Sequence, residues 1–286
     1  MRSKLTEITN IEEFIQDENE YFAPMLERQR GASEEQKEAW RKETIRERQA
    51  RISREVFDKC NGTVQRGLFK GLKLAANPWW GGLDLGSQCL GYYEQEILEL
   101  ISELPDEATR TFIDIGAADG YYAVGMLLTK KAEKCICFEA SEAGQAAIRD
   151  AWILNGAPGE LEIYGLANQT ALLSLPKFED GKTLALVDIE GGEFNLLTEA
   201  VIDKLAGSIV IIEVHEWETD FLTNYEALIY RLQKKFDLFK IPRTNKKVVN
   251  DANLRDFTDD NRQLLVSERR PSNMRFLFLT PTNSSY

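Results

Sequence analysis

The fold is decided by the segment Thr111-Phe-Ile-Asp-Ile-Gly-Ala-Ala-Asp-Gly-Tyr-Tyr122. Its apolar run predicts a buried strand, and the small residues that follow predict a turn into a helix. Gly116 and Gly120 can take backbone conformations that are closed to other residues. Ala117 and Ala118 keep the floor of the turn shallow, so the main chain can approach a ligand closely. We expect this turn to bind a cofactor that contains a nucleoside.

The charge of the turn indicates which cofactor it binds. The dinucleotide fingerprint needs glycines at its first, third and sixth positions, but counting from Gly116 this chain has Ala118 and Tyr121 at the last two. Asp119 adds a carboxylate, which would repel a pyrophosphate but attract the ammonium or sulfonium of S-adenosylmethionine. The turn therefore favours S-adenosylmethionine over NAD or FAD. A tight strand-to-helix connection without a ligand is the alternative.

A second acid supports the same cofactor. The run Lys134-Cys-Ile-Cys-Phe-Glu139 predicts a second buried strand that stops on a carboxylate. An acid at the tip of the second strand is where nucleotide-binding βαβ units hold the ribose diol. A solvated strand end is the alternative for Glu139 taken alone, and its position after the glycine turn favours the ribose role.

Length and charge limit the classes of protein that the chain can form. Its 286 residues are enough for one full core, and they predict one main domain with an appendage. The net charge of −12 argues against a surface that binds nucleic acid. No apolar run reaches membrane-spanning length, and the first residues lack the apolar segment of a signal peptide, so we expect a cytoplasmic protein that binds no membrane. The four cysteines match neither a disulfide framework nor a zinc site, and Cys135 and Cys137 are expected to be small buried hydrophobes on one face of a strand.

The chain divides into three parts. Residues 1–60 carry many charges of both signs and predict a helical extension, either solvated helices packed on the main domain or a lid or partner-binding arm. Residues 61–84 predict a β-hairpin followed by a loop rich in tryptophan and glycine. Residues 85–286 carry the main domain, where apolar runs alternate with helical stretches. The later runs lie at 161–164, 183–187, 208–214, 236–241 and 275–279. This alternation predicts an α/β fold with a Rossmann-like, doubly wound sheet, which binds ligands at the carboxyl ends of its strands.

Three acids follow the run that ends at Val187, within Asp188-Ile-Glu-Gly-Gly-Glu193. They share one rim, where the two glycines indicate that the backbone turns sharply beside a ligand. Asp188 is the candidate for contact with cofactor or substrate, and Glu190 is a second candidate catalytic group. Glu193 is the best candidate for a structural role at a helix N-terminus.

The only histidine of the chain ends the next run. His215 is the candidate general base, because an imidazole with a near-neutral pKa could accept a proton from a hydroxyl during methyl transfer. Glu213 or Glu216 could orient it. The primary interpretation assigns no metal. The alternative is a divalent cation held by Asp188, Glu190, Glu213 or His215, which would polarise a substrate hydroxyl.

With these residues in place, the chain resembles the FkbM-like family of class I S-adenosylmethionine-dependent methyltransferases. The likeness is carried by Leu90-Gly-Tyr-Tyr-Glu-Gln-Glu96, Phe112-Ile-Asp-Ile-Gly-Ala-Ala-Asp-Gly120, Val187-Asp-Ile-Glu-Gly-Gly-Glu193 and Ile212-Glu-Val-His215. It covers roughly residues 85–280 and leaves the extension unexplained. The resemblance implies a seven-stranded sheet with the last strand antiparallel, and O-methylation of a small molecule or glycan. One departure is Ala118, which stands where this turn often has glycine.

The residues that the motifs and the resemblance together place around the cofactor are Glu94, Asp114, Gly116, Ala117, Ala118, Asp119, Gly120, Glu139, Ala140, Asn168 and Asp188. Asn168 would lie near the adenine. We expect direct in-line methyl transfer without a covalent enzyme intermediate. The acceptor site would be walled by aromatic side chains, the candidates being Trp79, Trp80, Tyr121, Tyr122 and Trp217.

Two other classes of function stay open. A dinucleotide-dependent oxidoreductase would share the early βαβ unit. A catalytically silent domain would bind S-adenosylmethionine, or would bind a protein partner or another copy of the chain through the N-terminal helices. The methyl acceptor, the oligomeric state and the assistance of a metal depend on loop shapes that the sequence does not specify.

Overall fold

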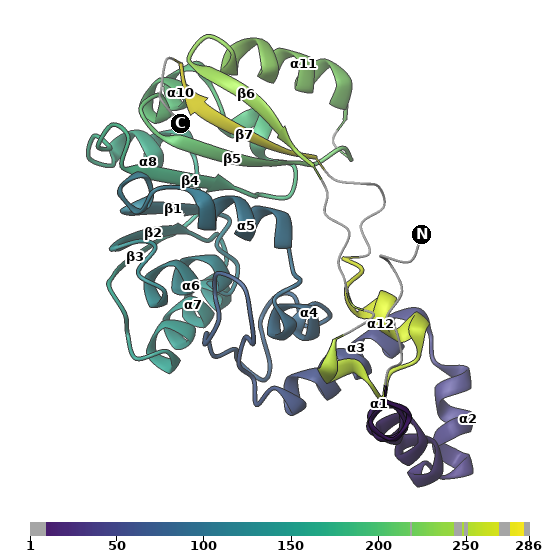
Figure 1. The fold of residues 1–286 in the computed structure, drawn as a ribbon. Coiled ribbons are helices and arrows are strands. Elements are labelled where there is room, and N and C mark those ends of the chain that lie inside the picture. The colour runs from purple at the N-terminus through teal and green to yellow at the C-terminus, as the bar shows by residue number, and fades with distance from the viewer. Residues whose placement is uncertain (1–9, 218, 243–247, 249–250, 269–274, 283–286) are drawn as a thin grey trace.

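The computed structural model describes residues 10–217, 219–242, 248, 251–268 and 275–282. Within these ranges, seven strands form one sheet in the order β3-β2-β1-β4-β5-β7-β6 (Figure 1). Their bounds are β1 Thr111–Ile115, β2 Lys134–Phe138, β3 Glu160–Tyr164, β4 Thr183–Val187, β5 Ile209–Val214, β6 Phe236–Ile241 and β7 Arg275–Pro281. Only β7 runs antiparallel to its neighbours, β5 and β6. The predicted doubly wound sheet with an antiparallel last strand is confirmed.

Helices cover both faces of the sheet. Neighbouring residues of a strand point to opposite faces, and the buried strands carry apolar side chains on both, so each face needs a layer of helices to bury it. In β1, Phe112 belongs to the core on one face and Ile113 to the core on the other. The first face is covered by α5 (Gln95–Glu103), α6 (Tyr121–Leu128) and α7 (Glu142–Leu154), and the second by α8 (Gln169–Ser174), α9 (Glu193–Leu196), α10 (Glu199–Leu205) and α11 (Phe221–Leu232). Cys135 and Cys137 are free, buried and both in the first core, as expected.

The N-terminal region is helical, as predicted. It contains α1 (Ile11–Gly31), α2 (Glu34–Lys42) and α3 (Ile45–Lys59), and α4 (Leu85–Leu90) precedes the sheet domain. Ser33 and Thr44 begin α2 and α3 as capping boxes, in which a side-chain oxygen accepts a backbone N–H and a Gln or Glu three residues later bonds back. No helix in the described parts of the chain is long and apolar enough to cross a membrane.

The N-terminal helices share a core with a distant part of the chain. Between β6 and β7, a turn of 3₁₀ helix, η3 (Ala252–Leu254), and α12 (Asp259–Leu265) leave the sheet and pack on α3 (Figure 1, purple and yellow). Ile52 and Val56 of α3 are buried against Leu254, Phe257 and Leu265. The Arg28 guanidinium of α1 lies 2.7 Å from Glu55 and 3.2 Å from Asp256. The helical region is therefore completed by residues that the sequence analysis counted with the main domain.

Residues 61–84 form turns rather than the expected hairpin. One antiparallel bridge joins Thr63 to Lys73, and no longer pairing is present in this segment. The segment packs on α6: a Cβ built on Gly125 would lie 2.6 Å from the ring of Phe69. Phe69 is fully buried, and its ring makes edge contacts with Tyr121 and Tyr122. The segment thereby brings the Trp79-Trp80 loop over the carboxyl ends of the strands. A further 3₁₀ turn, η2 (Asp106–Thr109), leads into β1.

Candidate active site

The turn after β1 is built around glycine at one position in particular. Gly116 has φ +98°, and a Cβ there would lie 1.7 Å from the backbone oxygen of Asp188. Only glycine fits, so the tips of β1 and β4 meet at this point. Gly120 caps α6 with φ +83°, in the left-handed region. Ala118 is also left-handed, with φ +49°, a conformation that glycine adopts more readily than alanine.

Glu139 at the tip of β2 is held by this turn. Its Oε2 accepts the backbone N–H of Ala118 at 3.0 Å, and its Oε1 accepts that of Ser141 at 2.8 Å. A Cβ on Gly144 would lie 2.6 Å from the Cγ of Glu139, so α7 packs closely behind the carboxylate. Each oxygen keeps a lone pair for a ligand. The carboxylate is therefore fixed in position and can accept hydrogen bonds from a diol.

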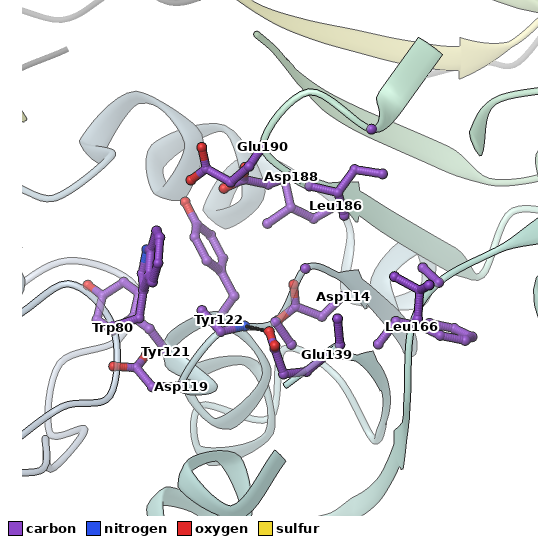
Figure 2. Close-up of a pocket in the computed structure, with 18 of the residues that line it drawn as sticks. Trp80, Asp114, Asp119, Tyr121, Tyr122, Glu139, Leu166, Leu186, Asp188 and Glu190 are labelled. Carbon is purple, nitrogen blue, oxygen red and sulfur yellow. Dashed lines mark hydrogen bonds between the residues drawn. The ribbon is translucent and has the colours of Figure 1, made fainter. Parts of the chain in front are cut away.

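A cavity of about 510 Å³ opens in front of these residues, between the ends of β1, β2 and β4 and the Trp79-Trp80 loop (Figure 2). The predicted site residues that line it are Asp114, Gly116, Ala117, Ala118, Asp119, Glu139, Ala140, Asn168, Asp188 and Glu190. Gly120 lines a neighbouring cavity of about 320 Å³. Gln88, Leu166, Gln169 and Asn195 also line the cavity and were not predicted from the sequence, because they belong to no motif. Their only signal is proximity to the motifs along the chain.

The pKa values of Asp114 and Asp119 are raised, mainly because both carboxyl groups are buried. Burial, and then the neighbouring Asp188, raise the pKa of Asp114 to about 8. Burial raises the pKa of Asp119 to about 6. Both acids line the same cavity. A cationic group placed between them would favour their ionised forms.

Glu94 lies behind the wall of the cavity and is not among the residues that line the cavity. Its buried carboxylate accepts the hydroxyl of Tyr122 at 2.6 Å. Glu94 itself has φ +43°, a left-handed conformation at the residue that precedes α5. Tyr122 lines the cavity, and burial and the Glu94 carboxylate raise the pKa of its hydroxyl. Glu94 is therefore connected to the cavity through the hydroxyl of Tyr122.

Glu193 organises the tip of β4. It is fully buried, and its Oε1 accepts the backbone N–H groups of Ile189 at 3.2 Å and Gly191 at 3.3 Å. The same oxygen lies 2.7 Å from Nδ1 of His215. The structural role expected for Glu193 is seen, but it extends to the histidine. Glu213 and Glu216 were the residues expected to orient the imidazole; in the structure Glu193 holds Nδ1, and Oε2 of Glu213 lies 3.8 Å from Nε2.

His215 lies behind the acids of the cavity. It is 1 % exposed, and its Nε2 is 3.6 Å from Oδ1 of Asp188 and 3.8 Å from Oε2 of Glu190. The Trp217 ring covers it at 4.5 Å between centroids. Burial lowers the pKa of His215, but Glu193 and the other acids outweigh it and raise the pKa above 6.5. Among the residues that line the cavity, the catalytic candidates are Asp188 and Glu190, and His215 reaches it only through them.

Comparison with known proteins gives similarity of fold alone. No protein-family model and no curated protein sequence matches the chain. The solved structures that resemble it include methyltransferases, at low identity. The tRNA m1A22 methyltransferase TrmK of B. subtilis is 14 % identical with a TM-score of 0.41, and the match covers 65 % of this chain and 64 % of that one.

Two further structures illustrate the range of these similarities. Sp1610 of Streptococcus pneumoniae, a putative tRNA (m1A22) methyltransferase in complex with S-adenosyl-L-methionine, is 14 % identical, with a TM-score of 0.40 over 67 % of this chain and 74 % of that one. FkbM of Methylobacillus flagellatus KT is 14 % identical, with a TM-score of 0.40 over 62 % of this chain and 45 % of that one. At this level of similarity, none of them assigns an activity to the chain.

Proposed function

We propose that this protein is an S-adenosylmethionine-dependent methyltransferase that methylates a hydroxyl of a small molecule or glycan. The observation that carries the proposal is the Glu139 carboxylate, which Ala118 and Ser141 hold at the tip of β2 beside the Gly116 turn. A carboxylate fixed there suits a ribose diol. Leu166 lies beyond Glu139 in the cavity (Figure 2), and it and Asn168, which also lines the cavity, suit the adenine.

The charge of the cavity supports this cofactor over a dinucleotide. Asp114, Asp119, Asp188 and Glu190 line it, and among the residues that the structure describes no lysine, arginine or histidine does so. A pyrophosphate would meet acids without a compensating cation, whereas the ammonium and sulfonium of S-adenosylmethionine would be attracted. The same lining disfavours the phosphates of a nucleic acid.

The walls of the cavity support a small acceptor with an apolar or sugar face. Trp79 and Trp80 line the cavity together with Gln88 and are 41 % and 51 % exposed. The centroids of their rings lie 5.8 Å apart. Aromatic rings of this kind pack against apolar and sugar faces. Figure 2 shows Trp80 across the cavity from Leu166, with Asp188 and Glu190 at a further edge. The acceptor would therefore enter between the tryptophan loop and the acids.

The acids of β4 would carry the proton transfer. When bound, S-adenosylmethionine supplies an activated methyl group, so the protein must mainly align the acceptor and exclude water. The Glu190 side chain is half exposed at the rim, and it would accept the hydroxyl proton at a carboxylate oxygen. His215 is then a positioning residue, because its Nε2 faces Asp188 and Glu190 from behind.

The test is calorimetric titration of the native protein with S-adenosylhomocysteine. Glu139→Gln should weaken binding about tenfold or more, the loss expected for roughly 1.4 kcal/mol of ribose hydrogen bonding. Glu142→Gln is the control, because Glu142 lies three residues away on α7 and is exposed. Absence of saturable binding to the native protein would overturn the proposal.

An acceptor screen follows if the cofactor binds. RNA methyltransferases are among the proteins of similar fold, so the screen should contain tRNA as the rival acceptor beside small phenols, sugars and glycans. Methyl transfer from labelled S-adenosylmethionine to hydroxyl compounds is the expected result. Transfer to tRNA alone would replace the proposed acceptor and leave the cofactor assignment intact.

A further inference from the structure

We propose that Asp188, Glu213 and His215 bind a divalent metal ion at the adjoining tips of β4 and β5. Each of these side chains offers one ligand atom, and the three atoms lie within 4.8 Å of one another. Nε2 of His215 is 3.6 Å from Oδ1 of Asp188 and 3.8 Å from Oε2 of Glu213. Ligands about 2.1 Å from one ion would lie roughly 3 to 4 Å apart, so the Nε2 separations need little adjustment.

The imidazole is oriented as a metal ligand. Its Nδ1 lies 2.7 Å from Glu193, whose Oε1 also accepts two backbone N–H groups and is therefore fixed. Metal-binding histidines are oriented in this way by a carboxylate on the other nitrogen. Nε2 of this buried side chain points at the acids. In the described part of the chain, the nearest carboxylate oxygen is 3.6 Å away, beyond hydrogen-bonding distance.

The charge of the cluster favours a cation, and the cavity supplies its entry path. Asp188, Glu190, Glu193 and Glu213 surround one imidazole, so even a protonated histidine would leave excess negative charge. A divalent ion would offset that charge. Asp188 and Glu190 line the cavity, so an ion can reach the cluster from there.

The donor atoms indicate the class of metal. One imidazole nitrogen with carboxylate oxygens suits Mn²⁺ better than Mg²⁺, which prefers oxygen ligands throughout. The role of the ion rests on the proposed function: it would polarise the acceptor hydroxyl, while Glu190 accepts the proton. Binding of the ion does not depend on that function, and it can be tested without cofactor or acceptor.

The experiment is titration of chelator-treated, untagged protein with MnCl₂, followed by electron paramagnetic resonance. Saturable binding is expected, with pulsed spectra that show the nitrogen coupling of an imidazole. Because His215 is the only histidine of the chain, that coupling can come from no other imidazole in the protein. Asp188→Asn and His215→Gln should weaken binding at least tenfold. Glu216→Gln, an acid next to His215 and outside the cluster, should bind as the native protein does.

Two results would overturn the proposal. One is absence of saturable Mn²⁺ binding to the native protein. The other is bound Mn²⁺ without imidazole coupling, which would place the ion elsewhere; this measurement uses the native chain and does not depend on the folding of a variant. Failure here with intact S-adenosylhomocysteine binding would reject the metal and keep the proposed function. Metal binding without S-adenosylhomocysteine binding would keep the metal site and reject the proposed function.

Discussion

Nδ1 of His215 lies 2.7 Å from Oε1 of Glu193, and both side chains are buried. The pair joins the end of β5 to the turn after β4, because the same Glu193 oxygen accepts the backbone N–H groups of Ile189 and Gly191. That turn carries Glu190 at φ +55°, a left-handed conformation that needs support from its surroundings. Glu193 therefore holds the rim of the cavity in shape, and Asp188 and Glu190 on the rim line the cavity.

Glu193→Ala should destabilise the protein by about 3 kcal/mol or more, because it leaves a buried imidazole and the N–H groups of Gly191, which is buried, and Ile189, which is partly buried, without their acceptor. Glu190→Ala should change stability by less than about 1 kcal/mol, since that side chain is 55 % exposed. Urea unfolding of both variants measures the difference. Equal losses would show that Glu193 has no special role in holding the rim.

Gly116→Ala should disrupt the site more than an equivalent change elsewhere. Gly116 and Gly71 have φ +98° and +94°, so alanine at either position carries a similar backbone strain of about 1 kcal/mol. Only at Gly116 would the new Cβ meet another atom, the Asp188 oxygen at 1.7 Å, because nothing lies within 4 Å at Gly71. We expect Gly116→Ala to abolish S-adenosylhomocysteine binding and Gly71→Ala to leave it unchanged, as measured by calorimetry. Intact binding in Gly116→Ala would contradict this geometry.

The stability of the protein should depend on pH through Asp114. Burial and the neighbouring Asp188 raise its native pKa to about 8, above the value near 3.9 in the unfolded chain. Its contribution to stability is then fully present below about pH 4 and is lost as the pH rises towards 8. Asp114→Asn should remove this loss, which has a limiting slope of about 1.4 kcal/mol per pH unit.

Urea unfolding of native and Asp114→Asn proteins between pH 5 and 8 measures this contribution. The advantage of the variant should grow with pH. Asp237→Asn, an exposed acid on β6, is the control and should follow the native protein. Parallel curves for the native protein and Asp114→Asn would mean that Asp114 titrates normally.

Phe257→Ala should loosen the helical region without altering the sheet domain. Phe257 is 1 % exposed in the core that α3 shares with α12, and the Lys59 ammonium lies 4.5 Å from its ring centre. Loss of such a side chain costs about 3 to 5 kcal/mol. Limited proteolysis should then cut α1–α3 first. Phe239→Ala, on β6 and 53 % exposed, should leave the digestion pattern unchanged.

The sequence by itself determined the sheet and the edge at which the cavity lies. Buried parallel strands must be short apolar runs, and the turn after β1 needs glycine where Gly116 meets Asp188, so both leave local signals. The acids at the strand tips were found for the same reason, since topology brings the carboxyl ends of parallel strands to one edge.

Tertiary structure alone decided three further features. The choice of Glu193 as the partner of His215 depends on distance across two strand tips, which no local pattern encodes. The packing of residues 251–266 on α3 joins segments about two hundred residues apart. The apolar face of an amphipathic helix shows that it will be buried, but not which segment will cover it. The expected hairpin at 63–75 is reduced to the Thr63–Lys73 bridge, and Phe69 from this segment packs on Tyr121 of α6. Each is a contact between distant parts of the chain, and side-chain packing in three dimensions selects among partners that are equivalent in sequence.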